Sequence, residues 1–268
     1  MSDFKCKFGF IGIGNMGFAI LKGLLFSYTP EQMTFTSKDK AQMEDVTGKT
    51  GVIAVEDNRE CAAAQYIILA VKPQQYDAVI ADIREVVSEK QIIISIAPGI
   101  TIANLKERFG KNLRIVRAMP NTPALVGEGM TGVCFEQERF SKEEQSTIQA
   151  FFGSFGKMEL VDEKLMNAVV CASGSSPAYV YMFIEALADS AVKYGMPRDA
   201  AYKMVAQTVL GSAKMVLETG EHPGKLKDQV CSPGGTTIAA VSALEEYGMR
   251  NALMKASDAC YEKCTNIK

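Results

Sequence analysis

The stretch Phe8-Gly9-Phe10-Ile11-Gly12-Ile13-Gly14-Asn15-Met16-Gly17 passes from an apolar run directly into the pattern G-x-G-x-x-G. A helical pattern of apolar residues follows at 19–25. In this setting Gly12 permits a tight turn, Gly14 lets the backbone approach a pyrophosphate, and Gly17 lets the helix pack close to the strand. Free N–H groups and the positive helix end would attract phosphates. The stretch therefore predicts a dinucleotide site, with a purely structural glycine turn as the alternative.

Composition narrows the class of protein further. The 268 residues are 47% hydrophobic and 22% charged, which is typical of one large or two modest globular domains. The net charge of −2 gives no electrostatic reason to expect nucleic acid. No apolar run approaches the ~18 residues of a membrane span, and the first apolar stretch is a strand rather than a signal peptide. We expect a cytoplasmic protein without nucleic-acid or membrane partners.

Seven cysteines are scattered along the chain, and none forms a C-x-x-C pair. Their odd number and spacing argue against a disulfide framework or a zinc site. Cys260 and Cys264 are four residues apart on a predicted helix, as two metal ligands could be, but no histidine lies near them. We expect buried or half-buried free thiols and no metal.

Strands and helices alternate over the first part of the chain. Strands are predicted at 7–12, 33–37, 52–55, 66–71, 91–96, 113–118, 130–135 and 156–161. The runs at 66–71 and 91–96 are continuously apolar, which suits strands buried on both faces of a parallel sheet. Helical patterns lie between strands, as at 73–88 and 101–109. The alternation predicts an α/β fold with a Rossmann-type doubly wound sheet over residues 1–162.

After residue 162 the pattern becomes entirely helical. Helices are predicted at 163–172, 177–194, 198–219, 223–230, 236–246 and 249–265. The segment 177–194 is apolar on most sides, and 198–219 is similarly rich in apolar residues. A helix that is apolar nearly all round must be buried nearly all round. We therefore expect an all-α domain over residues 163–268 that a second copy of the chain covers, which makes a homodimer.

The choice of cofactor depends on the residue that ends the second strand, about 20 positions after the glycine loop. No acidic residue stands at 36–38 to hold a ribose 2′-hydroxyl. Ser37 and Lys38 instead suit a 2′-phosphate by hydrogen bond and charge. Asp39 would reach a ribose if the strand ended later, and a solvated polar turn is the structural alternative. The segment favours NADPH and leaves NADH open.

Other strands end in turns at the same sheet edge, where ligands bind in such folds. The turn at 70–73 has Pro73 as the first helical residue. Lys72 in that turn is either a cofactor contact or a surface charge. The loop at 119–123 holds two prolines, which suggests a fixed shape rather than a mobile lid.

Two turns of the helical half combine glycines with hydroxyls. The segment 173–177 is expected to break one helix and start another, with Ser176 as N-cap and Pro177 as the first residue. The segment 232–237 does the same before Ile238. Each turn is either a helix cap or an anion site for a substrate carboxylate.

His222 is the only histidine and precedes a short predicted helix. We expect it to be a surface residue at the start of that helix rather than a general acid. The sequence has neither a Ser-His-Asp set nor an H-E-x-x-H motif, so hydrolysis is poorly supported.

Taken together, these stretches resemble the pyrroline-5-carboxylate reductase family over nearly the whole chain. The resemblance rests on 10–17, 69–73, RAMPNTPALVGEG at 117–129, SGSSPAY at 173–179, and most specifically HPGKLKD at 222–228 with SPGGTT at 232–237. Two departures are small: Ser176 stands where the family typically has Gly, and Pro98 where it typically has Ala. Ser176 would narrow the substrate pocket by one hydroxymethyl group.

The resemblance implies a Rossmann domain, a helical dimerisation domain and dimers that often assemble into rings. It implies reduction of 1-pyrroline-5-carboxylate to L-proline by NADPH or NADH, the last step of proline biosynthesis. By this resemblance the cofactor would contact Ile11, Gly12, Ile13, Gly14, Asn15, Met16, Ser37, Asn58, Ala70, Val71, Lys72, Pro73, Ile96 and Ala97. The motifs described above add Gly17 and Lys38 to the expected cofactor contacts. The substrate would lie among Glu163, Ser173, Gly174, Ser175, Ser176, Gly234, Gly235, Thr236 and Thr237.

The implied substrate is a cyclic imine that can arrive already protonated. The enzyme then mainly needs to orient it and to clamp its carboxylate. Thr237 is the candidate catalytic residue, by a hydrogen bond to the ring nitrogen through which it would relay the proton.

Parts of the sequence are also compatible with two other functions. A β-hydroxyacid dehydrogenase shares the glycine loop and a helical second domain, but it requires a catalytic lysine near a Gly-rich helix start, and 173–177 contains none. A non-enzymatic NAD(P)-binding protein would bind the cofactor without turning over an imine, and the intact substrate-side turns argue against it.

Overall fold

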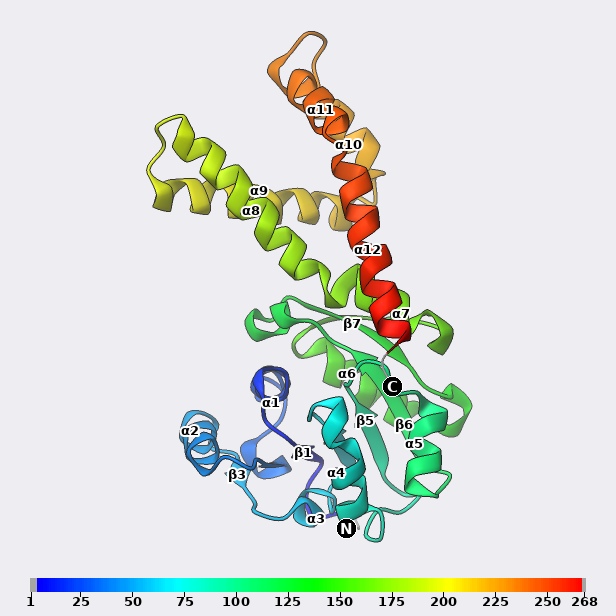
Figure 1. The fold of residues 1–268 in the computed structure, drawn as a ribbon. Coiled ribbons are helices and arrows are strands. Elements are labelled where there is room, and N and C mark those ends of the chain that lie inside the picture. The colour runs from blue at the N-terminus through cyan, green and yellow to red at the C-terminus, as the bar shows by residue number, and fades with distance from the viewer. Residues whose placement is uncertain (1–3, 267–268) are drawn as a thin grey trace. The chain divides into compact units, whose positions relative to one another are not determined.

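The computed structural model describes residues 4–266 and contains two compact units, one of residues 1–175 with 260–268 and one of 176–259 (Figure 1). We call them the sheet unit and the helical unit and describe each by itself. Residues 163–175 and the end of α12 (Met249–Thr265) belong to the sheet unit, so this division differs from a boundary at 162. The predicted domain boundary at 162 stays a prediction. Residues 1–3 and 267–268, at the outer ends of the two predicted domains, lie outside the described part.

Within residues 4–266, eight strands form one sheet in the order β3-β2-β1-β4-β5-β6-β7-β8. They are β1 (Phe8–Ile11), β2 (Met33–Thr36), β3 (Ile53–Ala54), β4 (Tyr66–Leu69), β5 (Ile92–Ser95), β6 (Arg114–Met119), β7 (Gly129–Cys134) and β8 (Gly156–Leu160). Each lies in a predicted strand segment, apart from one-residue shifts. The order reverses between β1 and β4, which places a ligand crevice at the carboxyl ends of these strands.

The sheet is parallel from β3 to β6, with Phe8 opposite both Met33 and Tyr66. At one edge β7 runs antiparallel to β6, and β8 runs parallel to β7. The link from β6 to β7 carries only the short 3₁₀ turn η3 (Thr122–Val126). A link of this length is too short for a crossover helix, so β7 returns antiparallel.

Helices cover both faces of the sheet (Figure 1). One core contains residues of α1 (Asn15–Leu24), α2 (Lys40–Thr50) and α6 (Lys142–Gly153). The other contains residues of α3 (Asn58–Cys61), α4 (Tyr76–Ile83), α5 (Ile102–Phe109) and α7 (Met166–Val169). Every residue of β4 and β5 is buried. The doubly wound sheet is therefore confirmed, and it explains why these strands are continuously apolar.

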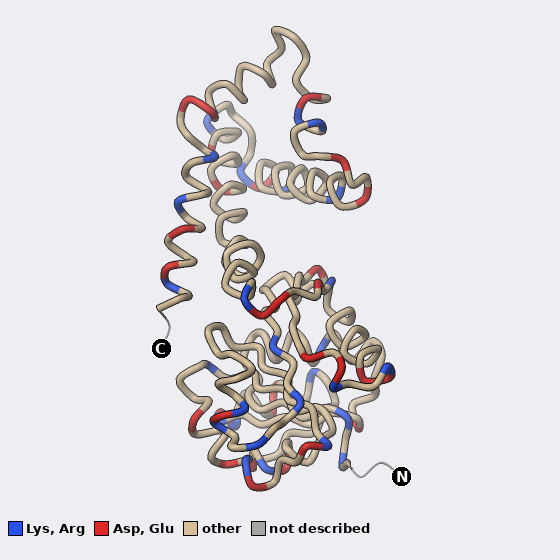
Figure 2. Tube along the Cα trace, turned by 90° about the vertical axis from the view of Figure 1, so that its right-hand side faces the viewer, with Lys and Arg blue, Asp and Glu red and all other residues tan. Residues whose placement is uncertain are grey.

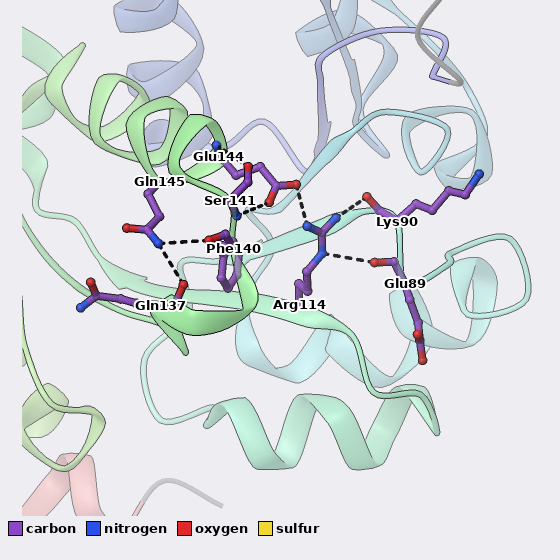
Figure 3. A network of polar contacts seen from close by, with 8 residues as sticks. All are labelled: Glu89, Lys90, Arg114, Gln137, Phe140, Ser141, Glu144 and Gln145. Carbon is purple, nitrogen blue, oxygen red and sulfur yellow. Dashed lines mark hydrogen bonds and ion pairs between the residues drawn. The ribbon is translucent and has the colours of Figure 1, made fainter.

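Arg114, at the start of β6, fastens α6 to the sheet (Figure 3). Its guanidinium donates to Glu144 Oε1 at 2.6 Å and to the carbonyl oxygens of Glu89 and Lys90. Glu144 also forms a capping box at the start of α6, since its Oε2 accepts from the Ser141 N–H at 2.9 Å. All three guanidinium nitrogens thus have acceptors, which is what a half-buried ion pair needs in order to stabilise the fold.

The described residues after β8 form only helices and turns. They are η5 (Glu163–Leu165), α7, the π-helical turn η6 (Val170–Gly174), α8 (Ser176–Lys193), α9 (Arg198–Thr219), α10 (Pro223–Val230), α11 (Thr236–Glu246) and α12. The predicted helices are confirmed, and so is the predicted break at 173–177, because one helical turn ends at Gly174 and α8 begins at Ser176, one residue before the expected first residue Pro177. The Ser175 N–H bonds to the Val170 carbonyl at 2.8 Å, so a π turn takes up the extra residue and α8 begins at Ser176.

The helical unit has a very small core of its own. Its buried apolar residues are Ala188, Ala201 and Val205. Large apolar side chains of α8 and α9 stay exposed, namely Val180, Tyr181, Met182, Phe183, Leu187, Met204, Leu210, Met215 and Leu217. One chain therefore does not bury the apolar faces that the sequence predicts.

Charged residues of both signs are interspersed along the chain rather than collected in one stretch (Figure 2). Among the described helices, none combines the length and apolar character needed to cross a membrane.

Candidate active site

The glycine loop joins β1 to α1 and lines a cavity of about 610 Å³. Gly12 has a φ of 91°, a left-handed conformation that favours glycine, and a Cβ there would meet Val71 Cγ1 at 2.6 Å. A Cβ on Gly17 would meet the Gly12 oxygen at 2.9 Å, so this glycine lets α1 pack against the loop. A Cβ on Gly14 would meet no described atom within 4 Å. Gly14 is the N-cap of α1, so this open space lies at a helix N-terminus, where a phosphate fits.

The cavity brings together the carboxyl ends of β1, β2 and β4 with the turns that follow them. It is lined by ten of the predicted cofactor residues: Ile11, Gly12, Ile13, Gly14, Ser37, Lys38, Asn58, Ala70, Val71 and Lys72. Asn15, Met16 and Gly17 belong to α1, Pro73 begins the 3₁₀ turn η2 (Pro73–Gln75), and Ile96 and Ala97 are buried after β5. For all sixteen residues, contact with the cofactor stays a prediction.

Strand β2 ends at Thr36, which puts Ser37 and Lys38 at the position that chooses the cofactor. Asp39 would occupy this position only if β2 ended later, and β2 ends at Thr36. Its Oδ1 accepts the Gln42 N–H at 3.2 Å, because Asp39 is the N-cap of α2. Its carboxylate therefore serves the helix, and the condition under which it would bind a ribose is not met.

Two lysines of this turn differ in their partners. Lys40 Nζ pairs with Glu56 Oε1 at 3.1 Å. Lys38 is exposed and forms no ion pair with any residue that the structure describes. Lys38 is thus the cation of this turn that is available to an anionic ligand in the cavity.

Asn58, the first residue of α3, is held from two sides. Its Oδ1 accepts from Thr36 Oγ1 at 2.9 Å, and its Nδ2 donates to Asp82 Oδ2 at 3.0 Å. Asp39, weighed as a ribose contact, also lines the cavity, and sequence reasoning missed several other lining residues: Thr36, Lys40, Gln42, Met43, Glu56, Gln75 and Val79. A signal existed for Glu56, since it follows β3 as Ser37 follows β2, and parallel strands present such residues at one edge.

Glu163, a predicted substrate contact, is already engaged within the sheet unit. Its Oε1 accepts from Arg117 Nη1 at 3.0 Å and from the Ile102 N–H at the start of α5 at 2.8 Å. Arg117 is only 5% exposed, so Glu163 balances a buried charge. Burial raises the pKa of the nearby Cys134 thiol to about 12, and the negative Glu163 adds to this shift. Contact between Glu163 and substrate stays a prediction.

The loop after β6 contacts Ser173, one of the predicted substrate residues. Asn121 Nδ2 donates to the Ser173 carbonyl at 3.0 Å, and Asn121 Oδ1 accepts the Met130 N–H at 2.9 Å. Ser175 Oγ lies 3.3 Å from Cys260 Sγ. The two bonds of Asn121 tie the loop to its neighbours, in keeping with its two prolines.

The second substrate turn lies in the helical unit, as does Ser176. Gly234 has a φ of 68°, and Gly235 is the extended N-cap of α11 without a side-chain cap. The helix begins at Thr236, as predicted. The half-buried Thr237 hydroxyl makes no hydrogen bond within the described part of the chain. The first turn thus offers N–H groups and a hydroxyl that are not used by the chain.

His222 caps α10, because its Nδ1 accepts the Gly224 N–H at 3.0 Å. Its predicted place at the surface start of a helix is confirmed. Within the described residues none of the seven cysteines forms a disulfide bond, and all of them are buried or half-buried, as predicted. Among residues 4–266, no group of His, Cys, Asp and Glu is arranged to hold a metal ion.

A doubly wound sheet with a glycine loop at its switch point, followed by an all-helical region, defines a dinucleotide-dependent oxidoreductase. Residues 7–99 match the family model described as "NADP oxidoreductase coenzyme F420-dependent", and residues 163–267 match "Pyrroline-5-carboxylate reductase dimerisation". The chain is 48% identical to pyrroline-5-carboxylate reductase of Escherichia coli over 264 residues, covering 97% of this chain and 98% of that protein. It therefore belongs to the pyrroline-5-carboxylate reductase family, whose members are NAD(P)H-dependent oxidoreductases.

Relatives and solved structures from distant organisms agree. The reductase of Methanosarcina acetivorans is 39% identical and covers 93% of both chains. The Plasmodium falciparum pyrroline carboxylate reductase, solved with NADP bound, superposes with a TM-score of 0.87 at 33% identity, over 98% of each chain. The Coxiella burnetii enzyme gives 0.88 at 34% identity, also over 98% of each chain. Neither alternative function drawn from the sequence is favoured by these similarities.

Proposed function

We propose that this chain reduces 1-pyrroline-5-carboxylate to L-proline, prefers NADPH, and works as a homodimer. The observation that carries the proposal is the open glycine-loop cavity in a chain similar to these reductases along nearly all of its length. The bound cofactor supplies a hydride to the imine carbon, and the ring nitrogen ends with one added proton. The protein contributes binding, orientation and the management of that proton.

The residues of the cavity fit a dinucleotide. The N–H groups at the start of α1 face the space that Gly14 leaves open, which suits a pyrophosphate. Ser37 and Lys38 suit the 2′-phosphate by hydrogen bond and charge. Asn58, Ala70, Val71 and Lys72 complete the wall.

The turn that opens α11 suits the substrate. Its free N–H groups would hold the carboxylate, and the Thr237 hydroxyl would hydrogen-bond the ring nitrogen. Ser173, Gly174, Ser175 and Ser176, with Glu163, are proposed to line the rest of the substrate pocket. No metal ligand set is required, because an iminium carbon is already electrophilic.

A turnover assay tests this proposal. Pyrroline-5-carboxylate is supplied with NADPH or with NADH, and proline is identified as the product. We expect proline to form with consumption of an equal amount of cofactor. Cofactor binding without proline formation would favour a non-enzymatic NAD(P)-binding protein instead.

Lys38→Ala should reduce the preference for NADPH. One charge-assisted hydrogen bond to a 2′-phosphate contributes roughly 1.5–3 kcal/mol, or about ten- to a hundredfold in kcat/KM. We therefore expect the wild type to prefer NADPH by that factor and the variant to lose most of it. Steady-state kcat/KM for the two cofactors gives the ratio.

Lys40→Ala is the matched control, because Lys40 lines the same cavity but is paired with Glu56. It should change the cofactor ratio less than Lys38→Ala does. A wild type that uses NADH better than NADPH would contradict the assignment of Ser37 and Lys38.

The quaternary structure is proposed on separate grounds. Residues 163–267 match a dimerisation model, and α8 and α9 expose large apolar side chains in one chain. A homodimer that covers these helices follows, and we extend this proposal to a ring of dimers. The mass of the native particle measures both.

A further inference from the structure

Tyr76, which the sequence analysis did not single out, is buried at the point where two site loops begin. It lies near the start of α4 and is 0% exposed. Its hydroxyl donates to the Leu69 carbonyl at 3.0 Å and lies 3.0 Å from Ser95 Oγ. Leu69 is the last residue of β4 and Ser95 the last of β5. One phenol therefore bridges the carboxyl ends of two neighbouring strands.

The bridge adds to a weak hydrogen bond of the sheet. The Ile96 N–H lies 3.5 Å from the Leu69 carbonyl, at the limit of a hydrogen bond. Earlier in the pair, Tyr66 lies opposite Ile92 and Ile68 opposite Ile94 in regular register. The β4–β5 ladder is thus loosening at this point, and the Tyr76 hydroxyl supplies the Leu69 carbonyl with a second and shorter donor.

Both loops that leave this point carry predicted cofactor residues. Ala70, Val71 and Lys72 follow β4 and line the cavity. Ile96 and Ala97 follow β5 and are buried. Burial raises the pKa of the Tyr76 phenol to about 12, so it keeps its proton and remains a donor at physiological pH.

We propose that Tyr76 is a positioning residue, which sets the gap between the β4 and β5 loops and thereby the placement of the reactive ring of the nicotinamide cofactor. The proposal rests on the proposed function for where that ring lies. Tyr76 touches neither cofactor nor substrate in this account. It acts through the Leu69 carbonyl and Ser95, and a misplacement of a reacting centre by a fraction of an ångström lowers turnover.

Tyr76→Phe removes the hydroxyl and keeps the ring. We expect kcat with pyrroline-5-carboxylate to fall roughly tenfold, while the dissociation constant of NADPH, measured by its fluorescence, changes by less than about twofold. The glycine loop and Lys38 hold the other end of the cofactor and do not depend on the bridge. In the protein without cofactor, hydrogen–deuterium exchange of the Ile96 amide should accelerate at least about tenfold.

Tyr66→Phe is the matched control. Tyr66 is also a buried tyrosine, 1% exposed, but it lies at the start of β4, at the other end of that strand from Leu69. The variant should leave kcat and Ile96 exchange as in the wild type. Should Tyr76→Phe fold poorly, Ser95→Ala breaks the same bridge from β5 and must lower kcat without weakening NADPH binding. Unchanged kcat, unchanged Ile96 exchange or an equal loss in Tyr66→Phe overturns the proposal. A wild type that forms no proline would instead refute the proposed function, and the exchange measurement would still test the bridge.

Discussion

Thr237→Ala should lower kcat/KM for pyrroline-5-carboxylate on the order of 10²-fold, the loss typical of one positioned proton-handling group. The dissociation constant of NADPH should change little, because Thr237 lies in the first turn of α11, outside the glycine-loop cavity. Its hydroxyl makes no hydrogen bond to the described residues, so its removal breaks no hydrogen bond within that part of the chain. A large loss of kcat/KM would therefore reflect a lost interaction with the substrate rather than a folding defect.

The pH dependence separates proton handling from simple positioning. The imine substrate is protonated at low pH and then needs less help at its nitrogen. The loss caused by Thr237→Ala should therefore shrink as the pH falls. Thr237→Ser keeps the hydroxyl and should retain most of the activity. If kcat/KM of Thr237→Ala equals that of the wild type across the pH range, Thr237 has no part in the mechanism and is only a helix-start residue.

The local sequence pattern was enough to predict the strands and the glycine loop that form the candidate cofactor site. The runs at 66–71 and 91–96 are apolar throughout because helices cover both faces of β4 and β5, and that burial can be read from the chain. The three glycines of the loop each meet a local requirement, a left-handed φ at Gly12, open space at Gly14 and close packing at Gly17. Such requirements act within one strand–turn–helix unit, and their sequence signature is short.

Contacts between distant segments could not be predicted in the same way. Glu163 pairs with Arg117 and caps α5 at Ile102, partners that lie 46 and 61 residues away. The Tyr76 bridge depends on the spacing of two strands, which no local pattern states. Gly and Ser residues locate the break at 173–177, but they do not predict the π turn at 170–174, which depends on one backbone bond from the Ser175 N–H to the Val170 carbonyl.

The helical unit leads to the other large expected effect, because its helices expose what a globular protein buries. Phe183 and Leu187 on α8 are 39% and 43% exposed, and Met182 is 69% exposed. Burying one such side chain contributes about 1.5–3 kcal/mol. The buried core of this unit is only Ala188, Ala201 and Val205, which is too small to hold long helices by itself. A second copy of the chain would supply the missing cover.

Phe183→Asp should therefore abolish the folded dimer and leave unfolded or aggregated protein, because it places an unpaired charge where the two copies meet. For the wild type, sedimentation at micromolar concentration should show no species at the 29.1 kDa of a single chain. Phe26→Asp makes the same substitution at a side chain that is 85% exposed in the sheet unit, and it should keep both the dimer and the fold. A compact wild-type monomer, or a dimeric and active Phe183→Asp, would show that α8 is not covered by a partner. The exposed apolar faces of α8 and α9 would then have to be stable in water, which their size makes physically unfavourable.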